Sequence, residues 1–248
     1  MSAAYSERLQ KVLASAGLCS RRTAETWILA GRVKINGVIV RELGVKVSRQ
    51  DVVEVDDKLI DAQEKVYYLF YKPRKVLCTS ESDGDRSKVV DYFPKDKRVF
   101  TVGRLDYDTS GLLLVTNDGD FAQQLIHPSH EVEKTYEVRV RGILEATAIK
   151  ALEQGIMLDG RLTQKTKVKV THKDFSARTT SFTIRLHEGR NRQIRRMCEA
   201  VGAPVSLLHR SRFAFLTLGD LKPGEYRLLK PFERQRLLAL AKQGQELR

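Results

Sequence analysis

The sequence is poor in cysteine and has no long apolar run. Its three cysteines, Cys19, Cys78 and Cys198, are far apart and form no C-x-x-C pair. This spacing disfavours a disulfide framework and a zinc site, and it fits a reducing compartment. No apolar stretch approaches the ~20 residues of a membrane span, and the N-terminal segment lacks the apolar core of a signal peptide. We therefore expect a cytoplasmic protein without a membrane partner.

The histidines also lack the spacing of metal ligands. His127, His130, His187 and His209 are not accompanied by a thiol pair, so we expect no metal site.

Acidic residues are outnumbered by basic ones. The 248 residues include 44 Lys and Arg against 31 Asp and Glu, which gives a net charge of +13. Such an excess favours a polyanionic partner, with nucleic acid ahead of a membrane surface. The alternative is a basic surface that only keeps the protein soluble. The length allows a small domain beside a larger one.

The first 62 residues have the pattern of a small α+β domain. We expect two helices, a tight hairpin and a further short strand. The signals are apolar periodicity over 6–17, an N-cap at Ser20, a stop at Gly31, the Asn36-Gly37 pair and the run DVVEV at 51–55.

Arg21 and Arg22 follow the predicted cap in the first turn of the second helix. The helix dipole disfavours cations there by a few tenths of a kcal/mol to ~1 kcal/mol each. This placement indicates an external anion such as RNA phosphate, and Arg32 and Lys34 can join the same contact. The alternative is a pair of solvated arginines.

The segment ERLQKVLASAGLCSRRTAETWILAGRVKINGVIV, residues 7–40, resembles an S4 domain, a small RNA-binding module. The resemblance implies binding of structured RNA. Taken together with the charge pattern, it leads us to expect Ser20, Arg21, Arg22, Arg32 and Lys34 among the RNA-binding residues.

Residues 63–248 predict a larger α+β domain with a largely antiparallel mixed sheet. The expected strands cover 66–73, 99–102, 112–116, 135–140, 165–170, 180–186, 205–208 and 213–218. The expected helices begin near Asp120 and cover 144–154, about 190–201 and 231–241.

The loop GRLDYDTSG, residues 103–111, lies between two apolar strands. A polar loop fixed by buried strands suits catalysis. On this evidence alone, Asp106 and Asp108 are equally well explained as turn residues.

Three motifs extend the interpretation. VGRLDYDTSGLLLVTNDG, KTYEVRV and EGRNRQIRRM resemble the signatures of the RsuA/RluB/RluE/RluF family of ribosomal RNA pseudouridine synthases. The resemblance implies that Asp106 is the catalytic aspartate, Tyr136 the motif tyrosine and Arg195 the ion-pair partner of Asp106. It also implies an apolar contact to the uracil from Leu207, and it implies no cofactor.

The reaction suits these residue types. Pseudouridine formation breaks the N1–C1′ bond of uridine and joins C5 to C1′, so it requires a nucleophile but no co-reactant. A carboxylate can attack C1′ or C6 and leave again, and a neighbouring arginine favours its charged form. A tyrosine can stack on the uracil and handle protons. The resemblance favours attack at C1′.

The target base must leave its stack to reach the aspartate. Arg104 is the candidate to fill the gap, with an ion pair to Asp108 or Asp118 as the alternative. Residues 185–212 hold seven arginines, two acids and no lysine, which favours phosphate contacts by Arg190 and Arg192. The alternative is a solvated helix face.

Two other functions stay open. A non-catalytic RNA-binding or ribosome-assembly protein would fit the charge and the S4-like segment equally well. A base hydrolase would pair Asp106 with a second carboxylate, for which Asp108 is the close candidate.

Within the synthase interpretation, LGVKVSRQ and the C-terminal region favour the large-subunit branch, with 23S RNA or an assembly particle as partner. The small-subunit 16S RNA is the alternative. We expect a monomer.

Overall fold

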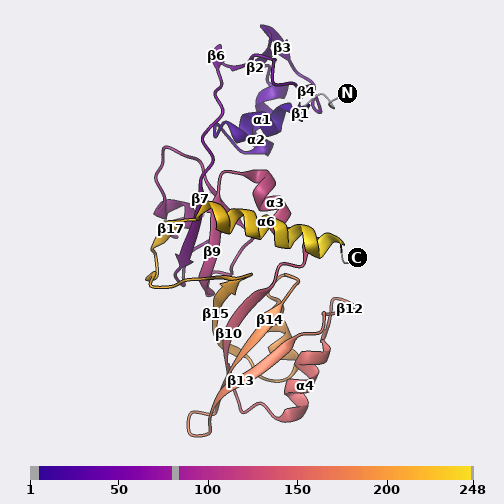
Figure 1. Cartoon of the computed structure of the whole chain (residues 1–248), viewed down its shortest axis with the longest axis vertical. Helices are drawn as coiled ribbons and strands as arrows, with labels where there is room; N and C mark the ends of the chain where they lie inside the picture. Colours follow the sequence, from indigo (N-terminus) through magenta and orange to yellow (C-terminus); the bar gives the residue numbers. More distant parts are fainter. Residues whose placement is uncertain (1–5, 80–83, 247–248) are drawn as a thin grey trace. The chain divides into compact units, whose positions relative to one another are not determined.

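The computed structural model describes residues 6–79 and 84–246, and the chain divides into two compact units. The first unit holds the residues up to Val66 together with Pro94–Val99 and Asn117–Gly119. The second holds Tyr67–Phe93, Phe100–Thr116 and the chain from Asp120 onward. Figure 1 shows their elements along the sequence.

The first unit packs two helices against a small sheet. Its elements are β1 (Glu7–Arg8), α1 (Leu9–Ser15), α2 (Arg21–Leu29), β2 (Val33–Ile35), β3 (Val38–Val40), β4 (Lys46–Val47), β5 (Val53–Val55) and β6 (Lys58–Leu59). The sheet order is β3-β2-β5-β6, and β1 pairs separately with β4. Leu9, Leu13, Ala24 and Ile28 are fully or almost fully buried between helices and sheet.

Local signals fix most of this unit. The hydroxyl of Ser20 accepts from the backbone nitrogen of Thr23 at 3.0 Å and caps α2. Asn36 and Gly37 adopt φ of 52° and 80°, as the hairpin turn requires. The first helix is shorter than expected, because Glu7–Arg8 are extended and pair with β4.

The second unit is built on a mixed sheet in the order β13-β14-β10-β15-β9-β7-β17. Among its described pairings, β15 with β9 is parallel and the others are antiparallel. The α+β class is therefore confirmed. The strands are β7 (Tyr67–Lys72), β8 (Phe100–Val102), β9 (Ser110–Thr116), β10 (Lys134–Arg141), β13 (Lys167–Asp174), β14 (Thr179–Leu186), β15 (Val205–Phe213), β16 (Leu216–Thr217) and β17 (Tyr226–Leu228).

Helices and a small hairpin complete the unit. They are η1 (Val89–Tyr92), α3 (Gly119–Ile126), η2 (Pro128–His130), α4 (Ala146–Gln154), α5 (Gln193–Ala200), α6 (Pro231–Glu246) and the hairpin of β11 (Met157–Leu158) with β12 (Arg161–Leu162). In one apolar core, α3 and α6 pack with β7 and β9. In the other, α4 and α5 cover one face of β10, β14 and β15 (Figure 1).

Several predicted elements of this unit differ in extent from the structure. The helix expected from about 190 begins at Gln193, because Arg192 takes a left-handed φ of 48°. The strand expected at 205–208 continues to Phe213 as β15, because His209, Arg210 and Arg212 also pair with β10. The strand expected at 213–218 is limited to β16, Leu216–Thr217, which pairs back on β15. Within the described residues, no helix is both long and apolar enough to cross a membrane.

Candidate active site

A buried lysine holds the loop that carries Asp106. Lys72, at the end of β7, has no exposed surface. Its Nζ donates to the carbonyl oxygens of Thr109 at 2.8 Å, Pro73 at 2.9 Å and Asp106 at 3.2 Å. The backbone nitrogen of Thr109 also donates to the carbonyl oxygen of Asp106 at 3.0 Å. These contacts fix the backbone on both sides of the carboxylate.

Burial lowers the pKa of Lys72 to about 8, since water is removed from its ammonium group. At neutral pH the side chain still carries its proton and serves the loop carbonyls as a donor.

Asp106 forms an ion pair with Arg195 in the first turn of α5. Arg195 Nε lies 3.7 Å from Asp106 Oδ2, with the two side chains 11% and 31% exposed. Arg195 Nε is buried without a hydrogen-bond partner among the described residues. The guanidinium thus places positive charge beside the carboxylate and keeps a donor available.

A small cavity of about 100 Å³ contains the carboxylate. Asp106 and Tyr136 lie at its wall together with the apolar side chains of Leu186, Ile194 and Leu208. The structure therefore brings together all three side chains that the resemblance marked as catalytic.

Leu207 is not part of this cavity, contrary to the expectation. Side chains alternate along β15, so that Leu208, paired with Val138, faces the cavity side. Leu207 pairs with Arg139 on the opposite face and is 36% exposed. The apolar contact beside Asp106 comes from Leu208.

A larger cavity of about 750 Å³ adjoins the small one and shares Arg104 and Tyr136 with it. Lys134 and Arg210 lie in its wall. Burial and the neighbouring Arg210 lower the pKa of Lys134 to about 8. The cavity is therefore lined by cations next to the carboxylate site.

Arg104 is exposed and lines both cavities. The acids proposed as its alternative partners have other neighbours. Asp108 lies 3.9 Å from Arg74, and Asp118 lies 2.9 Å from Lys65.

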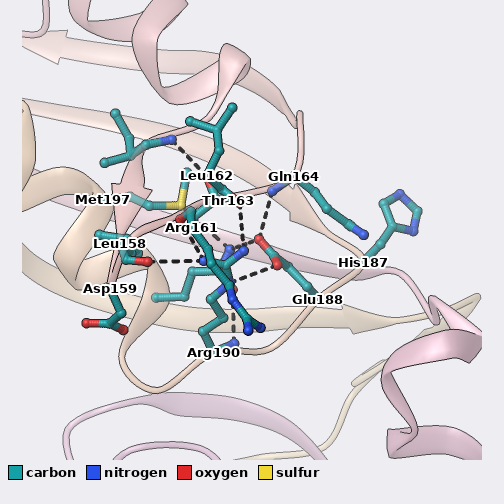
Figure 2. A network of polar contacts seen from close by, with 12 residues as sticks. Leu158, Asp159, Arg161, Leu162, Thr163, Gln164, His187, Glu188, Arg190 and Met197 are labelled. Atoms are coloured by element: carbon teal, nitrogen blue, oxygen red, sulfur yellow. Dashed lines mark hydrogen bonds and ion pairs between the residues drawn. The ribbon is translucent and has the colours of Figure 1, made fainter.

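Arg190 has a different environment from the predicted phosphate contact. Its guanidinium donates to Glu188 at 3.1 Å and to the carbonyl oxygens of Arg161 and Leu162 at 2.9 and 2.7 Å (Figure 2). Gln193 Nε2 donates to the same Glu188 carboxylate at 2.6 Å. Arg190 therefore ties the segment before α5 to the β11–β12 hairpin, and its donors are used within the protein.

Arg192 is exposed in front of α5 and lines the small cavity. Arg192 lies outside the helix that was expected to include it, and Arg196 within the helix donates to Asp159 at 2.6 and 2.9 Å.

In the first unit, Arg21 and Arg22 are exposed in the first turn of α2. Arg32 Nε donates to Asp56 at 2.9 Å and its guanidinium stacks over Trp27, while Lys34 pairs with Asp57. These two cations have acidic neighbours that the sequence pattern did not reveal.

Among the described residues, no three His, Cys, Asp or Glu side chains are grouped as metal ligands. The three cysteines are free thiols.

Sequence reasoning missed Lys72, Glu188, Gln193 and Leu208. A signal existed for Lys72, since it ends the otherwise apolar strand segment YYLFYK. The roles of Glu188 and Gln193 depend on a tertiary contact with the β11–β12 hairpin, which local sequence does not encode.

Comparison with known proteins defines the class. Residues 66–200 match the family model of RNA pseudouridylate synthases, and residues 7–53 match the S4 domain. The chain belongs to the RNA pseudouridylate synthase family and is an RNA pseudouridine synthase with an S4 domain.

Particular relatives narrow the class further. The chain is 48% identical to ribosomal large subunit pseudouridine synthase B of Bacillus subtilis, over 96% of this chain and 98% of that protein. It is 37% identical to the dual-specificity RNA pseudouridine synthase RluF of Escherichia coli, over 90% and 75% of the two chains. A crystal structure of a pseudouridylate synthase matches with a TM-score of 0.66 and 32% identity, covering 93% and 99%. The predicted family is confirmed.

Proposed function

We propose that the protein isomerises a uridine of large-subunit 23S ribosomal RNA to pseudouridine, with Asp106 as the nucleophile. The observation that carries this proposal is the Asp106–Arg195 ion pair, at 3.7 Å, at the wall of a cavity that also holds Tyr136 and Leu208. The likeness to the B. subtilis large-subunit enzyme supports the choice of RNA.

In the proposed reaction the target uracil enters the small cavity. A carboxylate oxygen of Asp106 bonds to C1′ as the N1–C1′ bond breaks, and this ester bond breaks again when C5 bonds to C1′. The detached base turns against Tyr136 and Leu208, and C5 then bonds to C1′. C5 loses a proton while N1 gains one, so the atoms balance without a cofactor. Arg195 holds and orients the carboxylate, and Tyr136 stacks on the base.

Arg104 is the proposed residue that fills the gap left by the flipped base. Its exposed position where the two cavities meet supports this role. The cost of flipping, a few kcal/mol, must be recovered from such contacts. The exposed Arg192 and the partly exposed Lys134, at the walls of the two cavities, are proposed to contact the RNA backbone beside the target. We assign Arg190 instead to positioning the segment before α5.

The domain division proposed from the sequence, 1–62 and 63–248, assigns RNA capture to the front part and chemistry to the rest. Ser20 orders the start of α2, and the exposed Arg21 and Arg22 are proposed to contact phosphate there. Arg32 and Lys34 would exchange Asp56 and Asp57 for phosphate on binding.

We further propose that the protein acts as a monomer in the cytoplasm. The residues that line both cavities belong to the second unit, and the cysteines are free thiols.

The test uses purified protein with transcripts of the large- and small-subunit RNAs and a reagent that marks pseudouridine. We expect one marked site in the large-subunit RNA. A mark confined to the small-subunit RNA would overturn the choice of substrate, and no mark in either would overturn the proposed activity on these RNAs.

The alternative function, a base hydrolase, is disfavoured because the second carboxylate that it would need is not at the small cavity. Asp108 is exposed beside Arg74 and is not among the residues of the small cavity. Release of free uracil in the same assay would reverse this conclusion.

A further inference from the structure

One face of the β13-β14-β10-β15 part of the sheet is not covered by the helices of the second core. The covered face packs against α4 and α5, and its buried side chains include Val138, Val140, Phe182 and Ile184. The intervening side chains point away from that core, because strand residues alternate between faces. Tyr136 and Leu208, at the active-site cavity, are on the buried side.

The uncovered face is strongly basic. We call it the outer sheet face and define it by six exposed cations: Lys167, Lys169, Arg139, Arg141, Arg185 and Arg212. Two acids, Glu137 and Asp174, alternate onto the same side, and Glu133 lies 3.9 Å from Arg185. Positive charge therefore dominates across four neighbouring strands.

The strand register places like charges opposite each other. Lys167 pairs directly with Arg185 across β13 and β14. Directly opposite like charges destabilise a sheet, so this arrangement lowers the stability of the free protein. Neighbouring strands are about 4.8 Å apart and alternate residues about 6.8 Å apart, so the cations form a two-dimensional array rather than a single pair. An external polyanion would offset their repulsion.

We propose that the outer sheet face binds the phosphate backbone of a second RNA segment, distinct from the one that presents the target uridine. The inference rests on the proposed function, since it takes the RNA substrate as the polyanion. Lysine and arginine contacts to phosphate supply much of the affinity of RNA-binding proteins without reading sequence. A segment on this face cannot reach Asp106, because the sheet separates the two.

This placement predicts that the face matters for long RNA and not for a short substrate. A fragment that fills only the active-site cavities leaves the outer sheet face empty. A long RNA can engage both sides of the sheet. An acidic protein is the other occupant that the charge would suit, and the experiment below tells it apart from RNA.

The experiment compares a triple variant with a matched control. The face variant replaces three cations of the outer sheet face by threonine, a residue that is favourable in strands. Its substitutions are Lys167→Thr, Lys169→Thr and Arg141→Thr. The control, Lys150→Gln, Lys222→Gln and Lys242→Gln, removes three exposed cations elsewhere in the same unit. Each protein is assayed on full-length large-subunit RNA and on a short fragment that carries the modified uridine.

With full-length RNA, we expect the face variant to have a raised KM and an unchanged kcat. The slope of log affinity against log salt should become shallower by about 2 to 3 for three lost phosphate contacts. With the short fragment, the face variant should equal wild type. The control should match wild type on both RNAs. If the face variant and the control have equal KM values and equal salt slopes on full-length RNA, the proposal is overturned. This is the result expected if the face binds an acidic protein instead of RNA.

Lysine labelling provides a readout that does not depend on catalysis. Full-length RNA should protect Lys167 and Lys169 from an amine-reactive reagent, while Lys150, Lys222 and Lys242 stay reactive. Equal labelling with and without RNA would overturn the proposal. If wild type makes no pseudouridine but the two lysines are protected, the proposed function fails and the RNA-binding face stands.

Discussion

Asp106 and Lys72 have different proposed roles at the loop of residues 103–111. The carboxylate is at the cavity wall beside Arg195, while the buried ammonium binds the carbonyl oxygens around it. A nucleophile needs a fixed position, because a displacement of about 1 Å can cost about 10²-fold in rate. We therefore propose that Lys72 is a positioning residue that does not itself meet the substrate.

Lys72→Met should lower kcat by about 10²-fold and leave KM nearly unchanged, since the loop carbonyls lose their shared donor. Steady-state kinetics on the RNA substrate measure the split. Lys75→Met is the control, because Lys75 is nearby but exposed. A proportional rise in KM would contradict a role confined to the loop, and a circular dichroism spectrum checks that the variant is folded.

The partial burial of Lys134 also makes stability depend on pH in a defined direction. The pKa of Lys134 falls from 10.5 to about 8 in the folded protein. The unfolded chain therefore binds more protons between those pH values, so the contribution of Lys134 to stability rises with pH through this window. Below about pH 8 the penalty of burying the charge is present in full.

Urea unfolding of wild type and Lys134→Met at pH 7.5 and 9.5 isolates this effect. The free energy of unfolding of wild type should increase relative to that of the variant as the pH rises. A difference that stays constant or shrinks would show that Lys134 is not buried as a charged group.

Leu207 and Leu208 form a matched pair for the cavity assignment. Leu208→Ala should destabilise the protein by about 2–5 kcal/mol and reduce kcat/KM, because it opens the wall beside Asp106. Leu207→Ala should do neither to a comparable extent, since its side chain is on the opposite face of β15. Thermal unfolding and kinetics compare the two, and a larger loss of kcat/KM in Leu207→Ala would restore the sequence-based choice.

At the scale of elements, the parallel contact of β9 with β15 sets the position of the active-site loop. Gly111 pairs with Arg210 in this contact and has a φ of 119°, and a Cβ added there would lie 2.3 Å from the carbonyl oxygen of Arg210. A side chain at this position would force the two strands apart directly after the loop that holds Asp106.

Gly111→Ala should therefore destabilise the protein more than Gly142→Ala does. Gly142 also has a positive φ, 99°, but an added Cβ there meets nothing within 4 Å. The difference between the two variants, measured as free energy of unfolding, separates the steric clash from backbone strain, which costs about 1 kcal/mol or more at either site. Equal losses would mean that the strands can separate without cost.

The elements show what local sequence can predict. A helix cap and a tight hairpin turn depend mainly on the residue types at the position itself. The structure has the predicted cap at Ser20 and the predicted turn at Asn36-Gly37. Asp106, Tyr136 and Arg195 were found through motif resemblance, and they share one site. The start of α5 was missed because Arg192 takes a left-handed conformation before Gln193.

Two site expectations differ from the arrangement in the structure for a common physical reason. Arg190 looked available for phosphate because its partners, Arg161 and Leu162, are almost thirty residues earlier in the chain. Leu207 was chosen over Leu208 because the pairing of β15 with β10, which decides the face, is a long-range property. Sequence patterns identify residue types, and tertiary pairing decides which of them face the site.

At the scale of the whole molecule, the cations behind the net charge of +13 differ in their environments. Some cations are engaged inside the protein, as Lys72 and Arg190 are. Others are exposed at α2, at the cavities and on the outer sheet face. Contact of a long RNA with several of these places, as proposed above, would account for a charge excess larger than one target loop needs.

The most direct test of the central claim is pseudouridine mapping of ribosomal RNA from cells that lack this protein and carry either wild type or Asp106→Asn. We predict that one large-subunit site disappears in the deletion and returns with wild type only, while Asp106→Asn keeps its affinity for RNA. Restoration of the site by Asp106→Asn, with deamidation excluded by mass spectrometry, would contradict the assignment of Asp106 as nucleophile.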